Sequence, residues 1–401
     1  MTTSHKKLVF IVNNPGFFLS HRINLAEAAG KLGYRVRLLS PTPSDQELEV
    51  LKTYHVAWDK MPLRPADMNI LGIFSSFFQA MLLAGSRGGS VFYLITIIPT
   101  LLYGLPLRIF NRPLMVPIPG LGSFFYSSRF TARILQRLIA LIYRFILNGR
   151  NSVAIVQNQD HRRTLLSWGV RRDKIQYIPG SGVDESKFYY SPRKNRGFPP
   201  AIVVPARLLA DKGIREACQA SGLLDQWQVP HKMIFAGSSD PGNPSSLSRN
   251  EISHLAKEFP SVQFPGFVRE MHSLLLESDL VCLPSYHEGL PRALIEAFAI
   301  GRPVVTTDVT GCREIVKHGL TGLLAQVKDP RSVALNIRKI IEDPELAGKL
   351  SRNAHTFFLK HLTLRKVTAQ TMNLLKNSEA TNRKVSAPGE EENREKVNKA
   401  K

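Results

Sequence analysis

Residues 285–305 read Ser-Tyr-His-Glu-Gly-Leu-Pro-Arg-Ala-Leu-Ile-Glu-Ala-Phe-Ala-Ile-Gly-Arg-Pro-Val-Val. Two glutamates, Glu288 and Glu296, bracket the start of a short helix in this stretch. Pro291 suits the first turn of that helix, because the amide that proline lacks would be unpaired there in any residue. Gly301 is typical of a helix end. The stretch therefore predicts a loop, a short helix and a following strand.

The beginning of this helix has the features of a phosphate-binding site. Backbone amides around Gly289 and Leu290 lie at the positive end of the helix dipole. Glu296 follows about 7–8 Å beyond Pro291, at about 1.5 Å rise per residue. Its carboxylate accepts hydrogen bonds and suits vicinal hydroxyls such as those of a ribose. The pattern favours a nucleotide diphosphate that is joined to a group with hydroxyls.

The composition allows two domains and indicates an anionic partner. The chain has 401 residues, with 53 Lys and Arg against 32 Asp and Glu, a formal net charge of +21. This excess attracts nucleic acid, an anionic membrane surface or phosphorylated substrates, although general solubility is a simpler explanation. The cysteines Cys218, Cys282 and Cys312 show neither zinc nor disulfide spacing, which fits a reducing cytoplasm. No signal peptide pattern precedes the first apolar segment, so a cytoplasmic location is expected.

Apolar segments rich in β-branched residues alternate with helical patterns along the chain, which predicts parallel sheets covered on both faces. We expect an α/β fold with two doubly wound, Rossmann-like domains that face each other across a cleft. The predicted domains are residues 1–190 and 191–375, joined by a linker near 190–200, with a disordered charged tail at 376–401. The predicted strands are 8–13, 34–40, 91–96, 114–119, 153–157, 175–179, 201–205, 233–236, 262–265, 280–284 and 304–307.

One stretch, residues 91–107, imitates a membrane span because it carries no charge. It is shorter than the ~20 residues that a spanning helix needs, and Pro99, Gly104 and Pro106 interrupt it. It predicts a buried strand followed by an apolar helix. Partial insertion into a bilayer surface is the alternative.

Cationic and glycine-containing loops follow several predicted strands. Arg207 and Lys212 flank a short turn after the strand at 201–205, an arrangement that suits two phosphates but also occurs in solvated loops. After the first strand, Gly16 would allow close approach of a ligand, Ser20 could cap the next helix and His21 could face the cleft. Further candidate contacts with the ligand follow other strands, at Gly122 and at Gly266, Phe267 and Val268.

Residues 130–149 predict a strongly amphipathic helix. Arg129, Arg133, Arg137 and Arg144 fall within an arc of about 80° at 100° per residue. The other side carries Ile134, Leu135, Leu138, Leu141, Ile142 and Phe145. The simple interpretation is a surface helix that packs on the sheet and has a solvated basic face. The alternative is an arginine row that meets lipid headgroups or a lipid-linked diphosphate.

Together these motifs resemble the retaining glycosyltransferases of the GT-B fold, in the large family numbered four. The resemblance covers nearly all of residues 7–375 and is strongest from 201 to 322. Its specific signature is the glutamate pair Glu288 and Glu296, with seven residues between them, inside Glu-Gly-Leu-Pro and Glu-Ala-Phe-Ala-Ile-Gly-Arg-Pro-Val-Val. The N-terminal half is similar to bacterial enzymes that build capsule, O-antigen or other surface glycans on undecaprenyl diphosphate carriers. The stretches that carry this similarity are Phe-Phe-Leu-Ser-His-Arg, Gly-Leu-Gly-Ser at 120–123, Val-Gln-Asn-Gln-Asp at 156–160 and Gly-Ser-Gly-Val-Asp at 180–184.

The resemblance implies a role for each matching residue. Glu296 is expected to hold the ribose, and the amides of Gly289 and Leu290 are expected to hold the diphosphate together with Arg207 and Lys212. Glu288 is expected near the donor sugar. Gly16 is expected to approach the diphosphate from the first domain. Family members often carry a histidine in the first domain's cleft, but residues 115–122 contain none, so only His21 is a candidate.

The implied reaction is transfer of a sugar from a nucleotide sugar, with UDP as the expected nucleotide, to a lipid-linked saccharide acceptor. No cofactor is expected, and no metal either, because no Asp-x-Asp pair is placed to hold one. The enzyme would work at the inner face of the cell membrane as a peripheral protein. The alternatives are a glycosyltransferase with a soluble acceptor and a basic nucleic-acid-binding protein. A dehydrogenase would need a G-x-G-x-x-G motif after a strand, and neither domain shows one.

Overall fold

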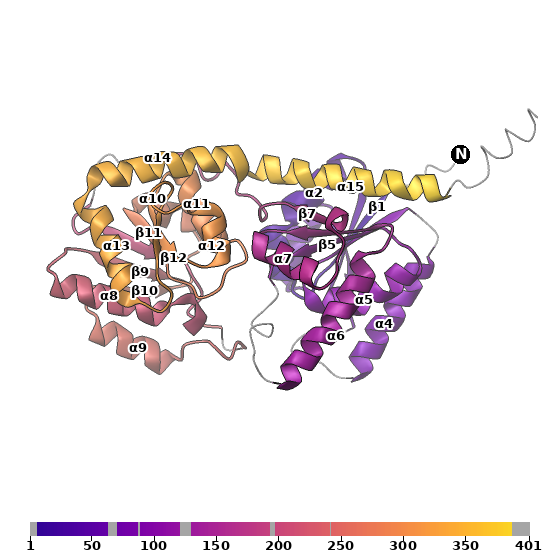
Figure 1. Cartoon of the computed structure of the whole chain (residues 1–401), viewed down its shortest axis with the longest axis horizontal. Helices are drawn as coiled ribbons and strands as arrows, with labels where there is room; N and C mark the ends of the chain where they lie inside the picture. Colours follow the sequence, from indigo (N-terminus) through magenta and orange to yellow (C-terminus); the bar gives the residue numbers. More distant parts are fainter. Residues whose placement is uncertain are drawn as a thin grey trace, which may run out of the picture. The chain divides into compact units, whose positions relative to one another are not determined.

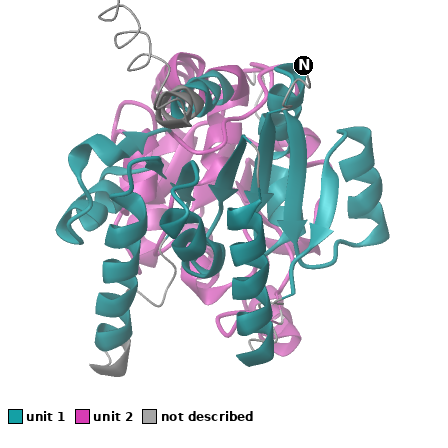
Figure 2. Ribbon diagram, turned by 90° about the vertical axis from the view of Figure 1, so that its right-hand side faces the viewer, with its two compact units in different colours: residues 1–178, 368–401 teal, residues 179–367 magenta. Residues whose placement is uncertain are grey.

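The computed structural model describes residues 6–62, 70–86, 89–120, 130–192, 197–240 and 242–386. The chain divides into two compact units, one formed by residues 1–178 and 368–401 and the other by residues 179–367 (Figure 2). The division falls at 178/179, before the linker expected near 190–200, and it returns the C-terminal segment to the first unit.

The first unit contains a seven-stranded parallel sheet in the order β3-β2-β1-β4-β5-β6-β7. Because β1 pairs with both β2 and β4, the direction of winding reverses between β1 and β4. The strands are β1 (Lys7–Ile11), β2 (Arg35–Ser40), β3 (Ala57–Lys60), β4 (Ser90–Leu94), β5 (Leu114–Ile118), β6 (Ser152–Val156) and β7 (Ile175–Tyr177).

Helices connect these strands and cover the sheet (Figure 1). Several begin at side-chain caps that the sequence supplies; Ser44 and Glu47, for example, form a capping box at the start of α3. The helices are α1 (Pro15–His21), α2 (Ile23–Lys31), α3 (Asp45–Thr53), α4 (Ile70–Gly85), α5 (Ile97–Ile109), α6 (Phe130–Leu147) and α7 (Gln159–Ser167).

The second unit contains a six-stranded parallel sheet in the order β10-β9-β8-β11-β12-β13. Successive residues of β11 point to opposite faces, and both faces are buried: Leu280 and Cys282 join one apolar cluster, and Val281 and Leu283 join the other. The strands are β8 (Ala201–Val204), β9 (Lys232–Ala236), β10 (Val262–Gly266), β11 (Leu280–Leu283), β12 (Val304–Thr307) and β13 (Leu323–Ala325).

The helices of the second unit alternate with its strands, as expected for right-handed crossovers. A 3₁₀ turn at Ala210–Lys212 precedes the first of them. They are α8 (Ile214–Gln226), α9 (Arg249–Glu258), α10 (Met271–Glu277), α11 (Arg292–Ile300), α12 (Thr310–Ile315), α13 (Pro330–Glu342) and α14 (Pro344–His361). The last helix, α15 (Leu364–Ser386), begins in this unit and ends in the first.

The structure confirms the two doubly wound α/β sheets that the sequence predicts and adds two edge strands, β3 and β13, which are short. Helix α15 continues through part of the segment expected as a disordered tail, as far as Ser386. The stretch that imitates a membrane span forms β4 and α5, as expected. Within the described ranges, no helix is both long and apolar enough to cross a bilayer.

Candidate active site

The expected donor-site residues of the second unit lie near the point of its sheet where the direction of chain winding reverses, between β8 and β11. Strands β8 and β11 are neighbours there, and the loops that follow both strands leave the same carboxyl edge. In open α/β sheets, ligands bind outside this edge at the point of reversal. The amide of Tyr286, after β11, donates to the carbonyl of Asp211, after β8, at 2.8 Å. This bond ties the two loops together.

Lys212 and Glu288 form the centre of this site. The Lys212 Nζ lies 2.7 Å from the Glu288 Oε1, and their side chains are only 19% and 13% exposed. Gly213, which follows Lys212, has φ +69° and lies so close to Pro284 that an added Cβ would fall 2.1 Å from the proline carbonyl oxygen. Only glycine fits that backbone position, and it lets the Lys212 turn approach the loop of Glu288.

Helix α11 starts directly after this ion pair. Pro291 is its N-cap and Gly301, with φ +76°, is its C-cap, close to the limits that the sequence predicts. The amides of Gly289 and Leu290 precede the first turn, at the positive end of the helix dipole. Gly311 of α12 packs beneath this turn, because an added Cβ would fall 2.3 Å from the carbonyl oxygen of Glu288. The turn is therefore held by backbone packing.

A second contact to this turn comes from Gly180, which has φ +66°. An added Cβ at Gly180 would fall 2.9 Å from the Leu290 side chain. The glycine turn around residue 180 thus lies beside the start of α11, within the second unit. The predicted domain boundary at 190/191 had placed this turn in the first domain.

Glu296 lies one turn into α11 and is 13% exposed. Burial raises the pKa of its carboxyl, and the neighbouring Arg292 opposes that shift. The Arg292 Nε lies 2.8 Å from the Glu296 Oε1, an i,i+4 pair on the helix. This pair holds the Glu296 carboxylate beside Arg292, the first residue of the helix.

Arg207 lies after β8 at the same edge and pairs with Asp240, which follows β9. The Arg207 Nη1 to Asp240 Oδ2 distance is 2.6 Å, but the side chains are 59% and 38% exposed. An exposed pair of this kind contributes little to stability, so the guanidinium can exchange its partner for an anionic ligand. Arg207 is therefore an exposed cation in the same loop region as the largely buried Lys212.

The contacts expected after β10 lie further along the same edge. Gly266 ends β10 with φ +82°, and Phe267, directly after it, is 77% exposed. Strand β9 separates β10 from β8, so these residues stand about 10 Å from the β8 loop at the usual strand spacing. Phe267 and Val268 could contact a flat ring only at the outer end of the site.

The first unit has its own point of reversal, between β1 and β4. There the Thr96 hydroxyl donates to the Asn13 side chain at 3.0 Å. Gly16 is the second residue of α1, and an added Cβ would lie 3.1 Å from the Glu47 carboxylate. Gly16 thus follows the loop at the reversal, as expected, inside a short helix that was not predicted.

His21 is the last residue of α1 and stacks on Phe17, with ring centroids 4.3 Å apart. Its Nδ1 lies 2.7 Å from the hydroxyl of Ser20. The expectation that Ser20 caps a helix is wrong, because Ser20 lies inside α1 and its hydroxyl donates to the carbonyl of Gly16 at 2.8 Å. The cap of α1 is Asn14.

The arginine row expected at 129–144 belongs to α6. Arg129 and Gly122 lie outside the described residues. Arg133 and Arg137 face α7, and Arg144 packs beside Gly169 at the end of α7. The prediction that the opposite apolar side packs on the sheet is wrong for all of its members except Ile142, which packs against the apolar core. The side chains of α6 that enter the core are Ile139, Tyr143, Ile146 and Leu147, whereas Ile134, Leu135, Leu138, Leu141 and Phe145 are 45–61% exposed.

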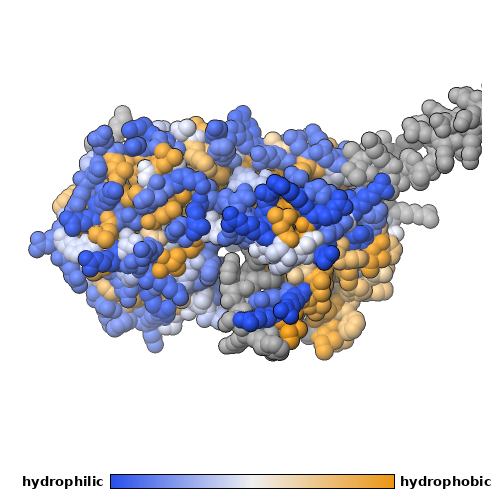
Figure 3. Space-filling model, in the orientation of Figure 1, coloured by the Kyte–Doolittle hydropathy of each residue, from blue (hydrophilic) through white to orange (hydrophobic). Residues whose placement is uncertain are grey.

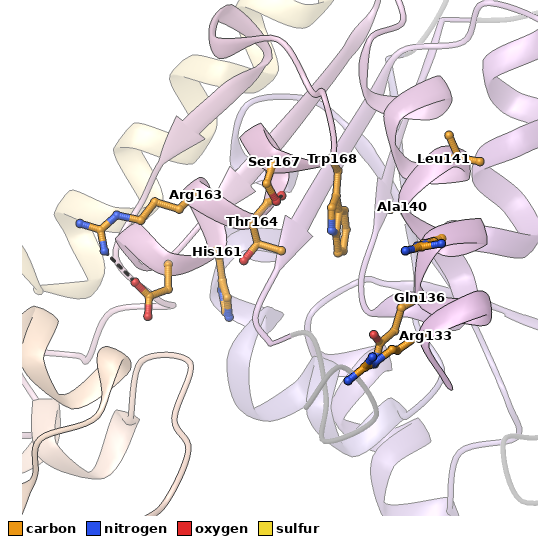
Figure 4. Close-up of a pocket in the computed structure, with 11 residues that line it drawn as sticks. Arg133, Gln136, Ala140, Leu141, His161, Arg163, Thr164, Ser167 and Trp168 are labelled. Carbon is orange, nitrogen blue, oxygen red and sulfur yellow. Dashed lines mark hydrogen bonds and ion pairs between the residues drawn. The ribbon is translucent and has the colours of Figure 1, made fainter. Parts of the chain in front are cut away.

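A pocket of about 960 Å³ lies between α6 and α7 (Figure 4). Arg133 and Gln136 point toward it from α6, and His161, Thr164 and Trp168 line it from α7. Arg163 points away from α6 and pairs with Asp160. Within the described part of the chain, neither Arg133 nor Arg137 forms an ion pair. We call this space the α6–α7 pocket.

His161 gives the α6–α7 pocket a polar floor. The side chain is 5% exposed, and its buried Nδ1 has no hydrogen-bond partner among the described residues. Burial lowers its pKa, so the ring is neutral near pH 7. The positive charge of the pocket therefore comes from the arginines.

Sequence reasoning missed the partners of the site residues. Asp240 and Arg292 neutralise Arg207 and Glu296, and Tyr286 ties the two loops. Arg292 could have been found from its i,i+4 spacing to Glu296. His161 and Asp240 carry no signal in the sequence, because only the fold brings them to their sites. In the described ranges, no three His, Cys, Asp or Glu side chains gather as metal ligands would.

Comparison with known proteins finds a family model that is similar to most of the second unit. Residues 191–357 match the family model described as glycosyl transferases group 1. The N,N'-diacetylbacillosaminyl-diphospho-undecaprenol alpha-1,3-N-acetylgalactosaminyltransferase of Campylobacter jejuni is 27% identical over 248 residues, 59% of this chain and 63% of that protein. The capsular polysaccharide biosynthesis glycosyltransferase CapM of Staphylococcus aureus is 29% identical over 147 residues, 37% of this chain and 38% of that protein. These matches span less than two thirds of either relative.

The fold is also found in solved structures. HepE of Anabaena, solved in complex with UDP and glucose, has a TM-score of 0.74 at 19% identity. The match covers 93% of this chain and all of that one. At this identity the likeness shows the fold, two Rossmann-like units in one chain, and nothing about the ligand.

Proposed function

We propose, from the match of residues 191–357 to the model of the group 1 glycosyl transferases, that the chain is a retaining glycosyltransferase. In this proposal it moves a sugar from a nucleotide sugar to a lipid-linked saccharide during surface polysaccharide biosynthesis. The observation that carries the proposal is the Lys212–Glu288 pair, which stands at the sheet reversal directly before the positive end of α11.

The donor is proposed to bind along the carboxyl edge of β8 and β11. Its diphosphate would contact the turn at Gly289 and Leu290, with Lys212 on one side and Arg207 exchanging Asp240 for a phosphate oxygen. Glu296, oriented by Arg292, would accept hydrogen bonds from the ribose hydroxyls. UDP is the nucleotide that we propose, and HepE, which shares the fold, was solved with UDP bound.

The chemistry follows from where charge develops. As the glycosidic bond to the diphosphate breaks, negative charge grows on the leaving phosphate oxygen, and fixed cations and amides stabilise it there. We assign this work to Lys212, Arg207 and the α11 turn, without a divalent metal. The acceptor hydroxyl would attack from the face that the diphosphate leaves. The leaving phosphate oxygen would then take the hydroxyl proton, so that no side chain need act as base.

Lys212 depends on Glu288 for its position. The carboxylate accepts from the ammonium at 2.7 Å and keeps it at the start of α11 when no donor is bound. In this proposal the side chain of Glu288 would lie beside the leaving group, where the donor sugar is attached. Two carboxylates on opposite sides of a sugar would indicate a glycoside hydrolase, but Glu288 directly precedes the Gly289–Leu290 turn and Glu296 lies on the helix that follows it.

The acceptor is proposed to bind in the first unit, with its anionic part in the α6–α7 pocket. Arg133 and Arg137 supply positive charge there, since neither has an ion-pair partner among the described residues, and Trp168 supplies an apolar wall. The Campylobacter jejuni relative is named for a diphospho-undecaprenol substrate, which supports an acceptor that combines a diphosphate with a lipid. A lipid carrier also implies that the chain works as a peripheral protein at the inner face of the cell membrane.

The proposal is tested by a transfer assay with a panel of nucleotide sugars and a short-chain lipid diphosphate saccharide. Thermal stabilisation by each nucleotide sugar selects the donor first, because a ligand that binds only the folded state raises its stability. We expect one nucleotide class to stabilise the protein and to support transfer with retention at the anomeric carbon. Stabilisation by none of them, or inversion at that carbon, would reject the proposal.

A further inference from the structure

Two helices of the first unit carry large apolar side chains on their outer surface. On α4, Leu71, Phe74 and Phe78 are 81%, 69% and 65% exposed. Figure 3 shows hydrophobic side chains gathered where Figure 1 draws α4 and α6. We call this surface the α4–α6 face. Its members are Ile70, Leu71, Phe74, Phe78, Leu82, Ile134, Leu135, Leu138, Leu141 and Phe145.

The pattern of α4 is the reverse of that expected for a helix at a water-exposed surface. Its buried side chains are small, namely Ser76, Ala80 and Ala84, which form one stripe with a spacing of four. Helix α4 packs closely against α5, and its large apolar side chains point outward. A surface helix in water normally turns its large apolar side chains to the core. The folding of the unit therefore does not explain the composition of α4.

The apolar surface continues beyond α4. Helix α5 packs against both α4 and α6, and α6 adds Leu138 and Leu141, which are 53% and 61% exposed. At the far end of α5, Ile109 and Phe110 are also exposed. Proteins that stay monomeric in water rarely expose apolar patches larger than a few hundred Å². The exposed apolar side chains of the α4–α6 face therefore indicate a binding surface.

The charges around the α4–α6 face indicate which kind of partner it binds. Neither α4 nor α6 contains an aspartate or glutamate. At about 100° per residue, Arg133, Arg137 and Arg144 occupy one narrow arc of α6, and its exposed apolar side chains occupy the next arc of about 120°. Apolar side chains beside a cationic row match the acyl chains and headgroups of an anionic bilayer. A protein partner would also need negative charge beside its apolar surface.

We propose that the α4–α6 face docks on a bilayer that contains anionic lipids. The apolar side chains enter the boundary between headgroups and acyl chains, and Arg133 and Arg137 meet the headgroups. Both helices connect parallel strands, so both begin at the carboxyl edge of the sheet. The first turns of α4 and α6 therefore place the bilayer at the carboxyl edge of the sheet, the edge at which the chain winding of the first unit reverses between β1 and β4. This inference does not rest on the transfer reaction.

The test is flotation of the full-length protein with vesicles of phosphatidylethanolamine and phosphatidylglycerol, compared with phosphatidylcholine alone. One variant combines Phe74→Ser with Phe78→Ser, and a second combines Leu138→Ser with Leu141→Ser. The matched control combines Leu335→Ser with Leu359→Ser, two exposed leucines (48% and 47%) on α13 and α14 of the second unit. We expect the control to bind anionic vesicles like the natural protein, and each α4 or α6 variant to bind at least tenfold less.

All three variants replace exposed side chains, so circular dichroism should show unchanged folding, and only folded variants are compared. The proposal is overturned if the natural protein does not float with anionic vesicles at low salt. Equal flotation of the natural protein and of the α4 and α6 variants with these vesicles would overturn it as well. It is also overturned if light scattering shows a dimer that the same substitutions dissociate, because the face would then bind a second copy. None of these outcomes involves a nucleotide sugar, so they leave the transfer reaction to its own test.

Discussion

The Lys212 Nζ and the Glu288 Oε1 lie 2.7 Å apart on two loops that leave neighbouring strands, although the two residues are 76 positions apart in the chain. Both side chains are largely buried, so each charge depends on the other for its stability in the fold. The pair therefore has a structural role as well as its proposed contact with the leaving diphosphate. A single substitution would disturb both roles at once.

A double variant separates the two roles. Lys212→Met alone leaves the Glu288 carboxylate buried without a cation, and we expect a loss of about 3 kcal/mol in the free energy of unfolding. Lys212→Met with Glu288→Gln replaces the charges by neutral groups of similar size and should regain most of that loss. Transfer should stay about 100- to 1,000-fold below the natural rate in both proteins, because the leaving group lacks its cation. Urea unfolding and a transfer assay measure the two effects. Recovery of activity together with stability would show that the pair is only structural.

Arg207 is expected to affect donor binding without affecting stability. Its pair with Asp240 is exposed, so Arg207→Gln should change the free energy of unfolding by less than about 1 kcal/mol. A lost charge-assisted hydrogen bond to phosphate should raise the KM for the donor about 10- to 100-fold. Arg37→Gln is the matched control, since it removes a similarly exposed pair with Asp59 in the first unit. Equal KM values in the two variants would contradict the assignment of Arg207.

The Glu296 carboxylate should lower the stability of the free protein and contribute to binding of the donor. Its pKa is raised in the folded protein, so the folded state keeps the proton longer and stability falls as pH rises from the unfolded carboxyl value, near 4.5, through the raised value. At pH 8, Glu296→Gln should therefore be at least as stable as the natural protein, and this advantage should shrink toward pH 4. The KM for the donor should rise about 10- to 100-fold, because the amide cannot accept from both ribose hydroxyls. Urea unfolding at the two pH values and donor kinetics test this. A variant that is less stable at pH 8 and binds the donor normally would refute it.

Gly311 should be essential to the Gly289–Leu290 turn, the proposed contact of the diphosphate, although glycine has no side chain that could touch the ligand. In Gly311→Ala, the new methyl group would press on the carbonyl oxygens of Glu288 and Gly289, at 2.3 Å and 2.6 Å before relaxation. We expect a loss of about 1–3 kcal/mol in stability and weaker binding of the nucleotide. Gly30→Ala, in α2, is the control, because nothing lies within 4 Å of its added Cβ. It should be neutral or stabilise by up to about 1 kcal/mol. Calorimetric titration with the nucleotide compares the two, and unchanged affinity in Gly311→Ala would contradict the role of the turn.

The proposed donor site was largely predictable because its residues follow the carboxyl ends of strands in the sequence. In parallel sheets those ends share one edge, so Lys212, Glu288 and Glu296 could be brought together without coordinates. Their partners could not all be found in this way. Asp240 reaches Arg207 only because β9 lies beside β8 in the sheet.

Helix α6 of the first unit shows what hydrophobic periodicity cannot predict. Helical spacing in α6 identifies an apolar arc with Leu138 and Leu141, but spacing cannot tell a face that meets the core from a face that meets another apolar medium. The core contacts come instead from Ile139 and Tyr143, on a separate arc. The edge strand β3 was missed because Ala-Trp-Asp-Lys has no apolar run.

The central claim is that the second unit binds a nucleotide diphosphate between Lys212 and the first turn of α11. The most direct measurement is a crystal structure of the protein with a UDP-sugar. We predict that the diphosphate lies within hydrogen-bonding distance of the Lys212 Nζ and the Leu290 amide, with the ribose on Glu296. A nucleotide bound elsewhere, with the edge of β8 and β11 empty, would contradict the account.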